Sequence, residues 1–590
     1  MTSTTSAVRG GAWLTEDVDA AAVLTPERLS EEHRLIGQTA DEFVDTEVLP
    51  VLERLEAKDW DLARALVRRC GELGLLGTDA PEELGGVALD KAASVVVGEA
   101  IGRCASFATT FGAQTGLAVT PLLCFGTEAQ KRAYVPRLVS GELTGAYALS
   151  ESGSGSDALS ARARAAKQPD GSFVLNGEKM WISNGGFADV FIVFARVVSD
   201  PGSGTGEDQF TAFIVERAFP GVSCGNEEHK MGLHGSSTTP LILQDARVPA
   251  ENVLGEIGKG HKVAFNVLNY GRFKLGAMCS GGARGVIAQA AAYAAQRKQF
   301  GQPIAGFGAI RHKLGEMVAR EYAVEAMLFR TAGLIDAMLD GSHESGAMLA
   351  ALEEFAVEAS ILKVASSEMI DFVVDENVQV HGGNGFVRDY PAERHYRDAR
   401  VNRIFEGTNE INRLLIPGML ARRAIKGTLP IVAAARRLQD EVLAPSLSGP
   451  ASDDPLEQAR RAVTTLKKVG LMVLGTAMQT YGARLADEQE VLTHAADIII
   501  DLFAAESSVL RAEAVAGNPL HSAAATLIVN DAAGRIELRA REALAAMTEG
   551  DTLRTLLAAL RRLMKFTPVN TVALRRQLAD ALCDRRVYPF

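Results

Sequence analysis

The sequence has 590 residues, 47% of them hydrophobic and 23% charged, with a formal net charge of −12 at pH 7. These values are typical of a globular chain of about four domains or subdomains, and they exclude a disordered or collagen-like protein. The acidic balance argues against a nucleic-acid partner, because phosphate contacts need clustered Lys and Arg.

Residues 26–145 are predicted to form a helical domain. Thr25 followed by Pro26 is typical of a helix start, with an N-cap residue before a proline in the first turn. Apolar residues between Leu35 and Val48 recur at helical spacing. The small, apolar composition of residues 91–123 favours buried, closely packed helices.

Residues 146–258 are predicted to form an antiparallel β domain. β-branched and aromatic runs between 172 and 197 are interrupted by Asn176-Gly177 and by Asn184-Gly185. Asn-Gly between such runs is the strongest short hairpin signal, so we expect a turn at each pair. The run of Gly, Ser and Thr at 202–206 indicates an exposed loop.

Helical periodicity returns over residues 259–428, which we expect to form a helical bundle broken at HGGNG (381–385). A Ser/Gly/Pro/Asp linker at 446–454 leads into a further helical region, so 446–590 is predicted as an appended helical domain. The predicted fold class is therefore α+β and multidomain, mostly α. It has no βαβ alternation and no Gly-x-Gly-x-x-Gly after a strand, which disfavours a doubly wound nucleotide fold.

Seven motifs in order along the chain resemble those of the acyl-CoA dehydrogenases. They are APEELGG (80–86), YALSESGSGSD (147–157), KMWISNGG (179–186), LNYGR (268–272), QRKQFGQPI (296–304), VQVHGGNGF (378–386) and RIFEGTNEINR (403–413). Each is weak alone, but seven in order leave little room for chance. The helical tail resembles the very-long-chain branch of the family. The resemblance implies an FAD enzyme with the cofactor at a homodimer interface.

The resemblance aligns Glu406 with the family's catalytic base, and its backbone N–H with a donor to the thioester oxygen. The reaction removes an α-proton and a β-hydride from an acyl thioester, so it needs a carboxylate in an apolar site and a flavin as hydride acceptor. One branch of the family carries the base just before Arg272, where this chain has Gly271, which cannot accept a proton. Taken alone, Glu406 could instead favour a helix start through the helix dipole.

The resemblance also implies a set of cofactor contacts. They are Tyr147, Leu149, Ser150, Trp181, Ser183, Arg297, Gln299, Phe300, Gln379, Gly382, Gly383, Thr408 and Glu410. The indole is expected against the flavin, and segments 297–300 and 379–383 are expected to act across the subunit interface. Each segment alone has a plainer interpretation, such as a capped turn at 147–157 or a helix-ending turn at 381–385.

Four residues are implied in substrate binding. They are Ser156, Asn269, Arg272 and Gly407. Arg272 is expected near the adenine and phosphates of CoA. Medium-chain relatives close the acyl tunnel with large polar side chains, whereas this chain has Thr109, Gly112 and Ala113 near those positions. We therefore expect a deep tunnel and a long-chain substrate, with ordinary tight helix packing as the alternative.

The resulting prediction is dehydrogenation of long-chain fatty acyl-CoA to trans-2-enoyl-CoA in fatty acid β-oxidation. An electron-transfer flavoprotein is expected to reoxidise the flavin. An oxygen-dependent acyl-CoA oxidase and a non-enzymatic assembly protein on the same fold are the alternatives.

Cysteine usage and hydropathy bear on the compartment. The six scattered cysteines form no Cys-x-x-Cys pair, which favours reduced thiols over a disulfide framework or a metal site. No apolar run reaches the roughly 18 residues of a membrane span, and no signal-peptide stretch is seen, so we expect a cytoplasmic protein. The segment 429–445 could lie on a membrane surface, but its few cations favour a core helix.

Overall fold

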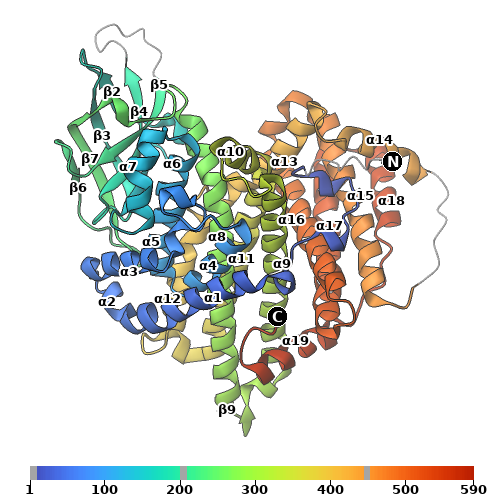
Figure 1. Ribbon diagram of the computed structural model, residues 1–590. Helices are drawn as coiled ribbons and strands as arrows, with labels where there is room; N and C mark the ends of the chain where they lie inside the picture. The colour runs from blue at the N-terminus through green and yellow to red at the C-terminus, as the bar shows by residue number, and fades with distance from the viewer. Residues whose placement is uncertain (1–8, 199–208, 444–451) are drawn as a thin grey trace.

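The computed structural model describes residues 9–198, 209–443 and 452–590. Figure 1 shows a β domain and a helical N-terminal region on one side of a long helical bundle, with a second helical region on the other side. The loop expected at 202–206 lies outside the described residues, as does most of the linker expected at 446–454. No helix in the described residues is long and apolar enough to cross a membrane.

The first long helix begins later than the sequence predicted. α1 (Glu31–Phe43) starts at Ser30, whose Oγ accepts a hydrogen bond from the His33 backbone N–H at 3.2 Å. The His33 Nδ1 accepts one from the Ser30 backbone N–H at 3.2 Å. This reciprocal capping satisfies two otherwise free N–H groups. Thr25 and Pro26 start a helix as predicted, but it is a single 3-10 turn (Pro26–Arg28) that ends before α1.

The remaining N-terminal helices pack closely against the bundle. They are α2 (Leu52–Glu56), α3 (Trp60–Glu72), α4 (Lys91–Gly102), α5 (Ala105–Gly112), α6 (Thr120–Phe125) and α7 (Glu128–Val139). α4 crosses α8 (Gly260–Gln296) at small residues, because a Cβ atom added to Gly98 would lie 2.9 Å from the Ala277 Cβ. One added to Gly102 would strike the Met278 carbonyl oxygen. The predicted close packing of this segment is therefore confirmed.

The β domain contains one eight-stranded sheet in the order β6-β7-β3-β2-β4-β5-β8, with β1 paired to β4. Its strands are β1 (Gly145–Ala148), β2 (Arg164–Lys167), β3 (Phe173–Ser183), β4 (Val190–Val198), β5 (Gln209–Glu216), β6 (Val222–Cys224), β7 (Thr238–Val248) and β8 (Val253–Leu254). Most pairs are antiparallel, as predicted. β4 differs because it pairs in parallel with both β1 and β2.

One of the two Asn-Gly pairs marks a turn and the other does not. Asn184 has a φ of 64° and begins the turn between β3 and β4, as predicted. Gly177 lies inside β3 with a φ of 148°, where the register with β7 shifts. The glycine accommodates a β-bulge, and β7 pairs on both sides of it, so the strand continues. The hairpin turn predicted at Asn176-Gly177 was therefore wrong.

The bundle is built around α8 and α11, which run side by side in Figure 1. α11 comprises Ala356–His381. The other elements of the bundle are β9 (Lys298–Gln299), β10 (Gln302–Pro303), α9 (Gly308–Leu339), α10 (Ser345–Glu354), α12 (Ala392–Ala399) and α13 (Asn409–Ile425). The predicted break at HGGNG is confirmed, because α11 ends at His381 and a 3-10 turn follows.

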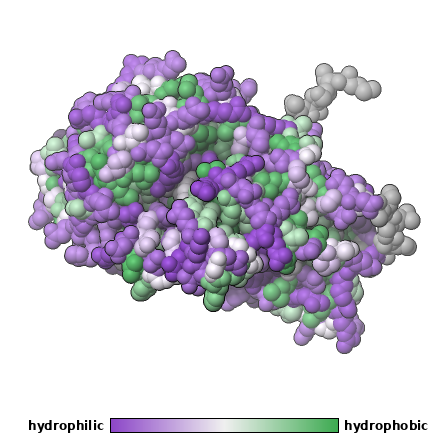
Figure 2. All heavy atoms as spheres, turned by 90° about the horizontal axis from the view of Figure 1, so that it is seen from below, coloured by the Kyte–Doolittle hydropathy of each residue, from purple (hydrophilic) through white to green (hydrophobic). Residues whose placement is uncertain are grey.

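The β9–β10 hairpin projects from the bottom of the bundle in Figure 1. Seen from below, the surface is mostly hydrophilic and its apolar residues form separate patches (Figure 2). Phe300, at the hairpin tip, is 95% exposed, and Phe386, after the HGGNG turn, is 86% exposed. Large apolar side chains this exposed are typical of an interaction surface.

The appended region is helical, as predicted. Its helices are α14 (Ile431–Leu443), α15 (Pro455–Tyr481), α16 (Gln489–Ala514), α17 (Pro519–Met547), α18 (Gly550–Leu563) and α19 (Thr571–Arg585). The apolar side of α14 packs against α15, with Ile431, Ala434 and Leu438 buried. These three residues support the core interpretation of the segment 429–445 over a membrane-surface helix.

Residues 9–29 contact both the bundle and the appended region. The sequence did not predict these contacts. Trp13 donates a hydrogen bond from Nε1 to Glu358 Oε1 at 3.0 Å, and its ring centroid lies 4.8 Å from that of Phe503 in α16. Glu27 accepts from Arg511 Nη2 of the same helix at 2.7 Å. The N-terminal segment therefore packs with helices that lie far from it in the sequence.

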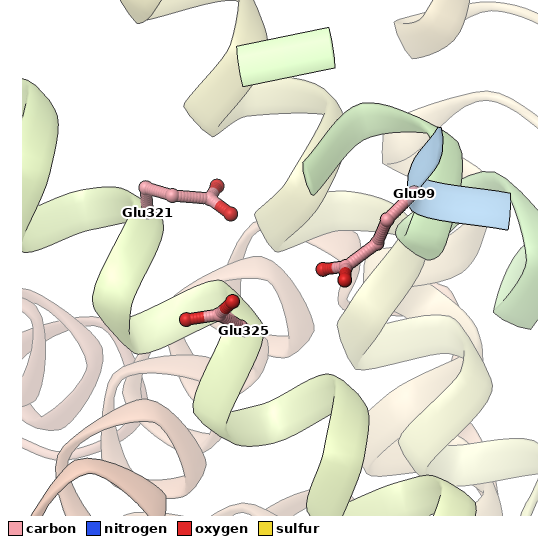
Figure 3. A group of neighbouring side chains, drawn as sticks. All are labelled: Glu99, Glu321 and Glu325. Atoms are coloured by element: carbon pink, nitrogen blue, oxygen red, sulfur yellow. The ribbon is translucent and has the colours of Figure 1, made fainter. Parts of the chain in front are cut away.

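A buried junction joins the N-terminal region, the bundle and the appended region. Glu99 from α4 and Glu321 and Glu325 from α9 point toward one another (Figure 3). Arg284 Nη1 of α8 lies 2.9 Å from Glu99 Oε2, and Arg511 Nη1 of α16 lies 2.6 Å from Glu325 Oε2. The two guanidinium groups offset part of the carboxylate charge and connect α8 and α16 to α9.

Candidate active site

Glu406 lies in the loop that precedes α13, in an unusual backbone conformation. Its φ is 57°, and the φ of Gly407 is 79°. A left-handed conformation at a non-glycine residue is strained and often marks a functional position. A Cβ atom added to Gly271 would lie 2.7 Å from Glu406 Oε2, so the absence of a side chain there makes room for the carboxylate.

The electrostatic environment of Glu406 suits a general base. Burial raises the pKa of the carboxyl to about 7, against the positive charges of Arg272 and Lys363, which lower it. Oε2 is buried and has no hydrogen-bond partner in the described residues. A carboxylate with a pKa near neutrality and a free oxygen can take a proton from a bound ligand.

Arg272 holds the backbone of Glu406. Its Nε donates to the Glu406 carbonyl oxygen at 3.0 Å, and its Nη1 donates to Asn269 Oδ1 at 3.0 Å. The side chain is only 5% exposed, and burial lowers its pKa to about 10. Its observed contacts shape the loop of the base, and a contact with CoA stays a prediction for both Arg272 and Asn269.

A cavity runs from Glu406 along α8. On that helix its lining extends from Gly271 to Val286, fifteen residues or about 22 Å of helix. Thr109, Gly112 and Ala113 also line this cavity, and the deep acyl tunnel inferred from their small size stays a prediction. The cavity therefore has the Glu406 carboxylate and residues over about four turns of α8 in its wall.

β3 ends beside this cavity and presents Trp181. The indole is 56% exposed, and its backbone has a φ of 60° where the register with β7 shifts. Ser183 lines the same cavity as Glu406. The Met180 backbone N–H donates to the Ser150 carbonyl oxygen at 2.9 Å, which fixes the strand against the loop after β1. An exposed indole next to a hydroxyl suits a flat aromatic ligand that stacks and accepts a hydrogen bond.

The loop after β1 is anchored by a buried ion pair. Lys179 Nζ lies 2.7 Å from Glu151 Oε1 and donates to the Leu149 carbonyl oxygen at 3.1 Å. Ser156 is exposed farther along this loop. Tyr147, at the start, lies close enough to Glu406 that its pKa is raised by burial and by that carboxylate. The structure thus brings Tyr147 and the anchored loop to the neighbourhood of the base.

Family models match most of the chain. They are the acyl-CoA dehydrogenase N-terminal domain (residues 30–142), middle domain (146–246) and C-terminal domain (258–420), and a second C-terminal domain model (465–562). A probable acyl-CoA dehydrogenase of Bacillus subtilis is 46% identical over 98% of both chains. The human mitochondrial very long-chain specific enzyme is 41% identical over 65% of this chain and 56% of its own length.

A solved structure agrees over almost the whole chain. The acyl-CoA dehydrogenase of Bacillus anthracis complexed with FAD superposes with a TM-score of 0.95 and 45% identity, covering 99% of this chain and all of that one. This chain belongs to the acyl-CoA dehydrogenase family. It is an FAD-dependent oxidoreductase that acts on the CH–CH bond of acyl-CoA, with the mostly helical fold predicted from the sequence.

The residues of this acyl-CoA dehydrogenase fit a flavin dinucleotide. Trp181 and Ser183 provide the stacking surface and the hydroxyl described above. At the end of α11, Gly382 has a φ of 60°, and a Cβ atom added to Gly382 or Gly383 would meet no other atom within 4 Å. Open backbone of this kind leaves room for a phosphate group to approach the N–H groups.

The segments 297–300 and 379–383 lie away from Glu406. Arg297, Gln299 and Phe300 are exposed at the β9–β10 hairpin, and Gln379 is exposed near the end of α11. The two segments are neighbours, since Tyr293 donates to the His381 carbonyl oxygen at 3.2 Å. Along α8, twenty-six residues or about 39 Å separate Gly271 from Arg297. Their distance from Glu406 agrees with residues that contact the cofactor of a partner subunit.

Thr408 and Glu410 lie at the start of α13, directly after Glu406 and Gly407. Thr408 is its N-cap and accepts from the Ile411 backbone N–H at 3.3 Å, while Glu410 is exposed in the first turn. The Gly407 carbonyl oxygen accepts from Asn412 Nδ2 at 2.8 Å. These contacts fix the backbone around Glu406, and the cofactor and substrate contacts of Thr408, Glu410 and Gly407 stay predictions.

Two buried lysines near the cavity were missed from the sequence. Lys363 of α11 is fully buried and acts electrostatically on Glu406. Lys274 lines the cavity and forms an ion pair with Asp79 at 3.0 Å, and Lys91 lies 2.5 Å from the same carboxylate. Both lysines lie within otherwise apolar helical stretches, and this pattern could have identified them. A lysine is rarely buried unless it is paired, so a lysine in a buried helix indicates a specific role.

Proposed function

We propose that this acyl-CoA dehydrogenase oxidises long-chain fatty acyl-CoA to trans-2-enoyl-CoA in fatty acid β-oxidation, with Glu406 as the base. The supporting observation is a carboxylate of pKa about 7 at one end of a cavity that follows α8 for about four turns. The alignment of this residue with the family's catalytic glutamate supports the same role.

The length of the cavity supports a long acyl chain. An extended alkyl chain of about 1.5 Å bonds advances about 1.25 Å per carbon, so about 22 Å holds roughly 18 carbons. Glycines and alanines dominate the N-terminal wall, including Ala105, Ala108 and Gly116. Apolar groups buried along this length contribute about 0.8 kcal/mol per methylene, which favours long chains over short ones.

The chemical step uses groups of this chain in defined roles. The Glu406 carboxylate accepts the α-proton, and the electron pair of that C–H bond forms the new double bond as the β-hydrogen leaves as hydride. FAD, when bound, supplies the hydride acceptor. The Glu406 backbone N–H donates to the thioester oxygen and stabilises the developing negative charge. Arg272 keeps this N–H in place through its hydrogen bond to the Glu406 carbonyl oxygen.

The partners follow from the same proposal. We infer a homodimer, because the exposed segments 297–300 and 379–383 lie far from the cavity of their own chain. An electron-transfer flavoprotein is the proposed electron acceptor, and molecular oxygen is the acceptor in the alternative oxidase reaction.

Anaerobic flavin bleaching by acyl-CoA thioesters from butyryl to stearoyl tests the proposal. We expect the fastest bleaching with palmitoyl or stearoyl thioesters, and a loss of several orders of magnitude in Glu406→Gln with FAD still bound. Near-normal bleaching in that variant would assign the base to another residue. Rapid peroxide formation in air without an added acceptor would favour the oxidase.

A further inference from the structure

Lys363 is a buried cation that the reaction described above does not use. It lies on α11, is 0% exposed, and donates from Nζ to Asn409 Oδ1 at 2.6 Å. No ion pair involves Lys363 in the described part of the chain. Burying an ammonium group without a direct carboxylate partner is costly, so its charge requires a compensating interaction or a function.

The hydrogen bond from Lys363 reaches the helix that follows the base. Asn409 is the first residue of α13, three positions after Glu406. Its Nδ2 donates to Glu368 Oε1 at 3.0 Å and to Ser367 Oγ at 3.1 Å. The amide is therefore held between an ammonium group on its oxygen and a carboxylate on its nitrogen, so its orientation is fixed.

The ionisable groups around Lys363 come from α8 and from the loop and first turn at the start of α13. Arg272 and Cys279 lie on α8, and Glu406 and Glu410 lie in and after the loop before α13. Burial lowers the pKa of Lys363 to about 8, while the Glu406 carboxylate raises it. Arg272 is held to the Glu406 carbonyl oxygen, so Lys363 is a second, independent positive charge near the carboxylate.

We propose that Lys363 is a positioning residue for the catalytic base. Through Asn409 it fixes the first turn of α13 next to Glu406, and its positive charge keeps the Glu406 side chain ionised before the substrate proton is transferred. This inference rests on the proposed role of Glu406 as the base.

The proposal predicts a change in pH dependence. A nearby positive charge lowers the pKa of a carboxyl group by about one unit or more. Removing it in Lys363→Met should therefore raise the pKa of Glu406, so the acid limb of the flavin-reduction rate should move up by about one pH unit. At about pH 6.5 the rate should fall roughly tenfold, and at about pH 9 it should approach that of the wild type.

The test is anaerobic flavin reduction by palmitoyl-CoA from about pH 6 to about pH 9. Lys363→Arg keeps the charge and should keep the acid limb. Asn409→Ala keeps the charge but removes the hydrogen bond, so it should lower the rate at every pH without moving the limb. Lys363→Gln is the second neutral variant, measured in case the methionine variant does not retain FAD.

Lys467→Met is the control, because Lys467 is also a buried lysine but, unlike Lys363, it pairs directly with a carboxylate, Glu506, and belongs to the appended region. It should leave the pH profile unchanged. An unmoved acid limb in both neutral variants of Lys363, with Glu406→Gln inactive, would overturn the proposal for Lys363 and leave the base intact. An active Glu406→Gln would instead overturn the proposed function.

Discussion

The Glu406 site and the buried junction of Glu99, Glu321 and Glu325 both place carboxylates away from water, but with different partners. At the junction, Ser280, Arg284 and Arg511 contact carboxylate oxygens directly. At the active site, Arg272 contacts the backbone of Glu406 and leaves Oε2 unpaired. Direct pairing holds domains together, whereas a base must keep an oxygen free for the substrate proton.

Breaking the junction should have the largest effect. Arg511→Met leaves the half-buried Glu27 without its guanidinium partner and leaves the buried Glu325 with the guanidinium of Arg284, at 3.4 Å. The loss should lower the free energy of unfolding by about 3–5 kcal/mol. Denaturant unfolding measures this loss, and activity per bound flavin should change little. Arg554→Met, at an exposed pair with Asp551, is the control and should have little effect. Equal losses in both variants would mean that the junction contributes no more than a surface pair.

Crowding the base should have the next largest effect. Gly271→Ala places a Cβ atom 2.7 Å from Glu406 Oε2, so the carboxylate must move away from the substrate. We expect a roughly hundredfold loss of flavin-reduction rate, with unfolding little changed. Gly285→Ala on the same helix is the control, because its Cβ would lie 4.0 Å from the nearest atom, Arg103 Cγ. A wild-type rate in Gly271→Ala would show that the carboxylate tolerates displacement.

Narrowing the cavity should change selectivity rather than chemistry. A Cβ atom at Gly112 would lie 3.1 Å from Met278 Cε, so Gly112→Val should close the tunnel at this point. We expect bleaching by palmitoyl-CoA to slow roughly tenfold while bleaching by butyryl-CoA is unchanged. The ratio of the two rates is the measurement, with Gly285→Ala again as the control. An unchanged ratio would contradict the path of the acyl chain along this wall.

The junction should also carry a proton. Ser280 Oγ lies 2.7 Å from Glu99 Oε1 and 2.5 Å from Glu321 Oε1. A hydroxyl group has one hydrogen, so one of the two carboxyl groups must be protonated to make the second bond. Burial and the neighbouring carboxylates Glu325 and Glu99 raise the pKa of Glu321 well above its usual range, which assigns the proton to Glu321.

The raised pKa of Glu321 sets the direction of a stability change with pH. The folded state holds this proton above the pH at which the unfolded chain releases it, so the stabilisation is complete below about pH 4.5 and is lost as pH rises. Glu321→Gln resembles the protonated form, so its free energy of unfolding should fall less between about pH 5 and about pH 8 than that of the wild type. Parallel curves for the variant and the wild type would show that Glu321 carries no such proton.

Local sequence patterns predicted whether each region is helical or β-structured. They did not predict features of the structure that depend on contacts between residues far apart in the sequence. The region 446–590, predicted to be helical, contains Leu492, Ala496, Ile499 and Phe503 at helical spacing, and all four are buried in α16. A helical period suffices to define such a buried face. The hairpin turn predicted at Asn176-Gly177 was wrong because strand pairing with β7 outweighs the local preference of these residues for a turn. The position of the segment 9–29 could not be predicted, because this segment packs against α11 and α16, which lie far away in the sequence.

The same distinction applies to the active site. Glu406 and the small residues Thr109, Gly112 and Ala113 of the cavity wall could be found from the sequence, because they lie in or near stretches that resemble the family. The sequence did not identify all of the positive charges around Glu406. Arg272 lies in a motif, but Lys363 is near Glu406 only because α11 packs beside α13, and no local pattern reports that contact.

The hydrogen bond between Glu27 and Arg511 spans 484 residues of sequence. At about 5–20 residues per second, a ribosome needs roughly 24 to 97 s to synthesise the partner after the first residue has emerged. During that time the segment 9–29 is without α16, which carries Arg511 and the Phe503 ring that packs on Trp13. The contacts of this segment with α16 are therefore a late step of biogenesis, and they form only after the catalytic bundle has been completely synthesised.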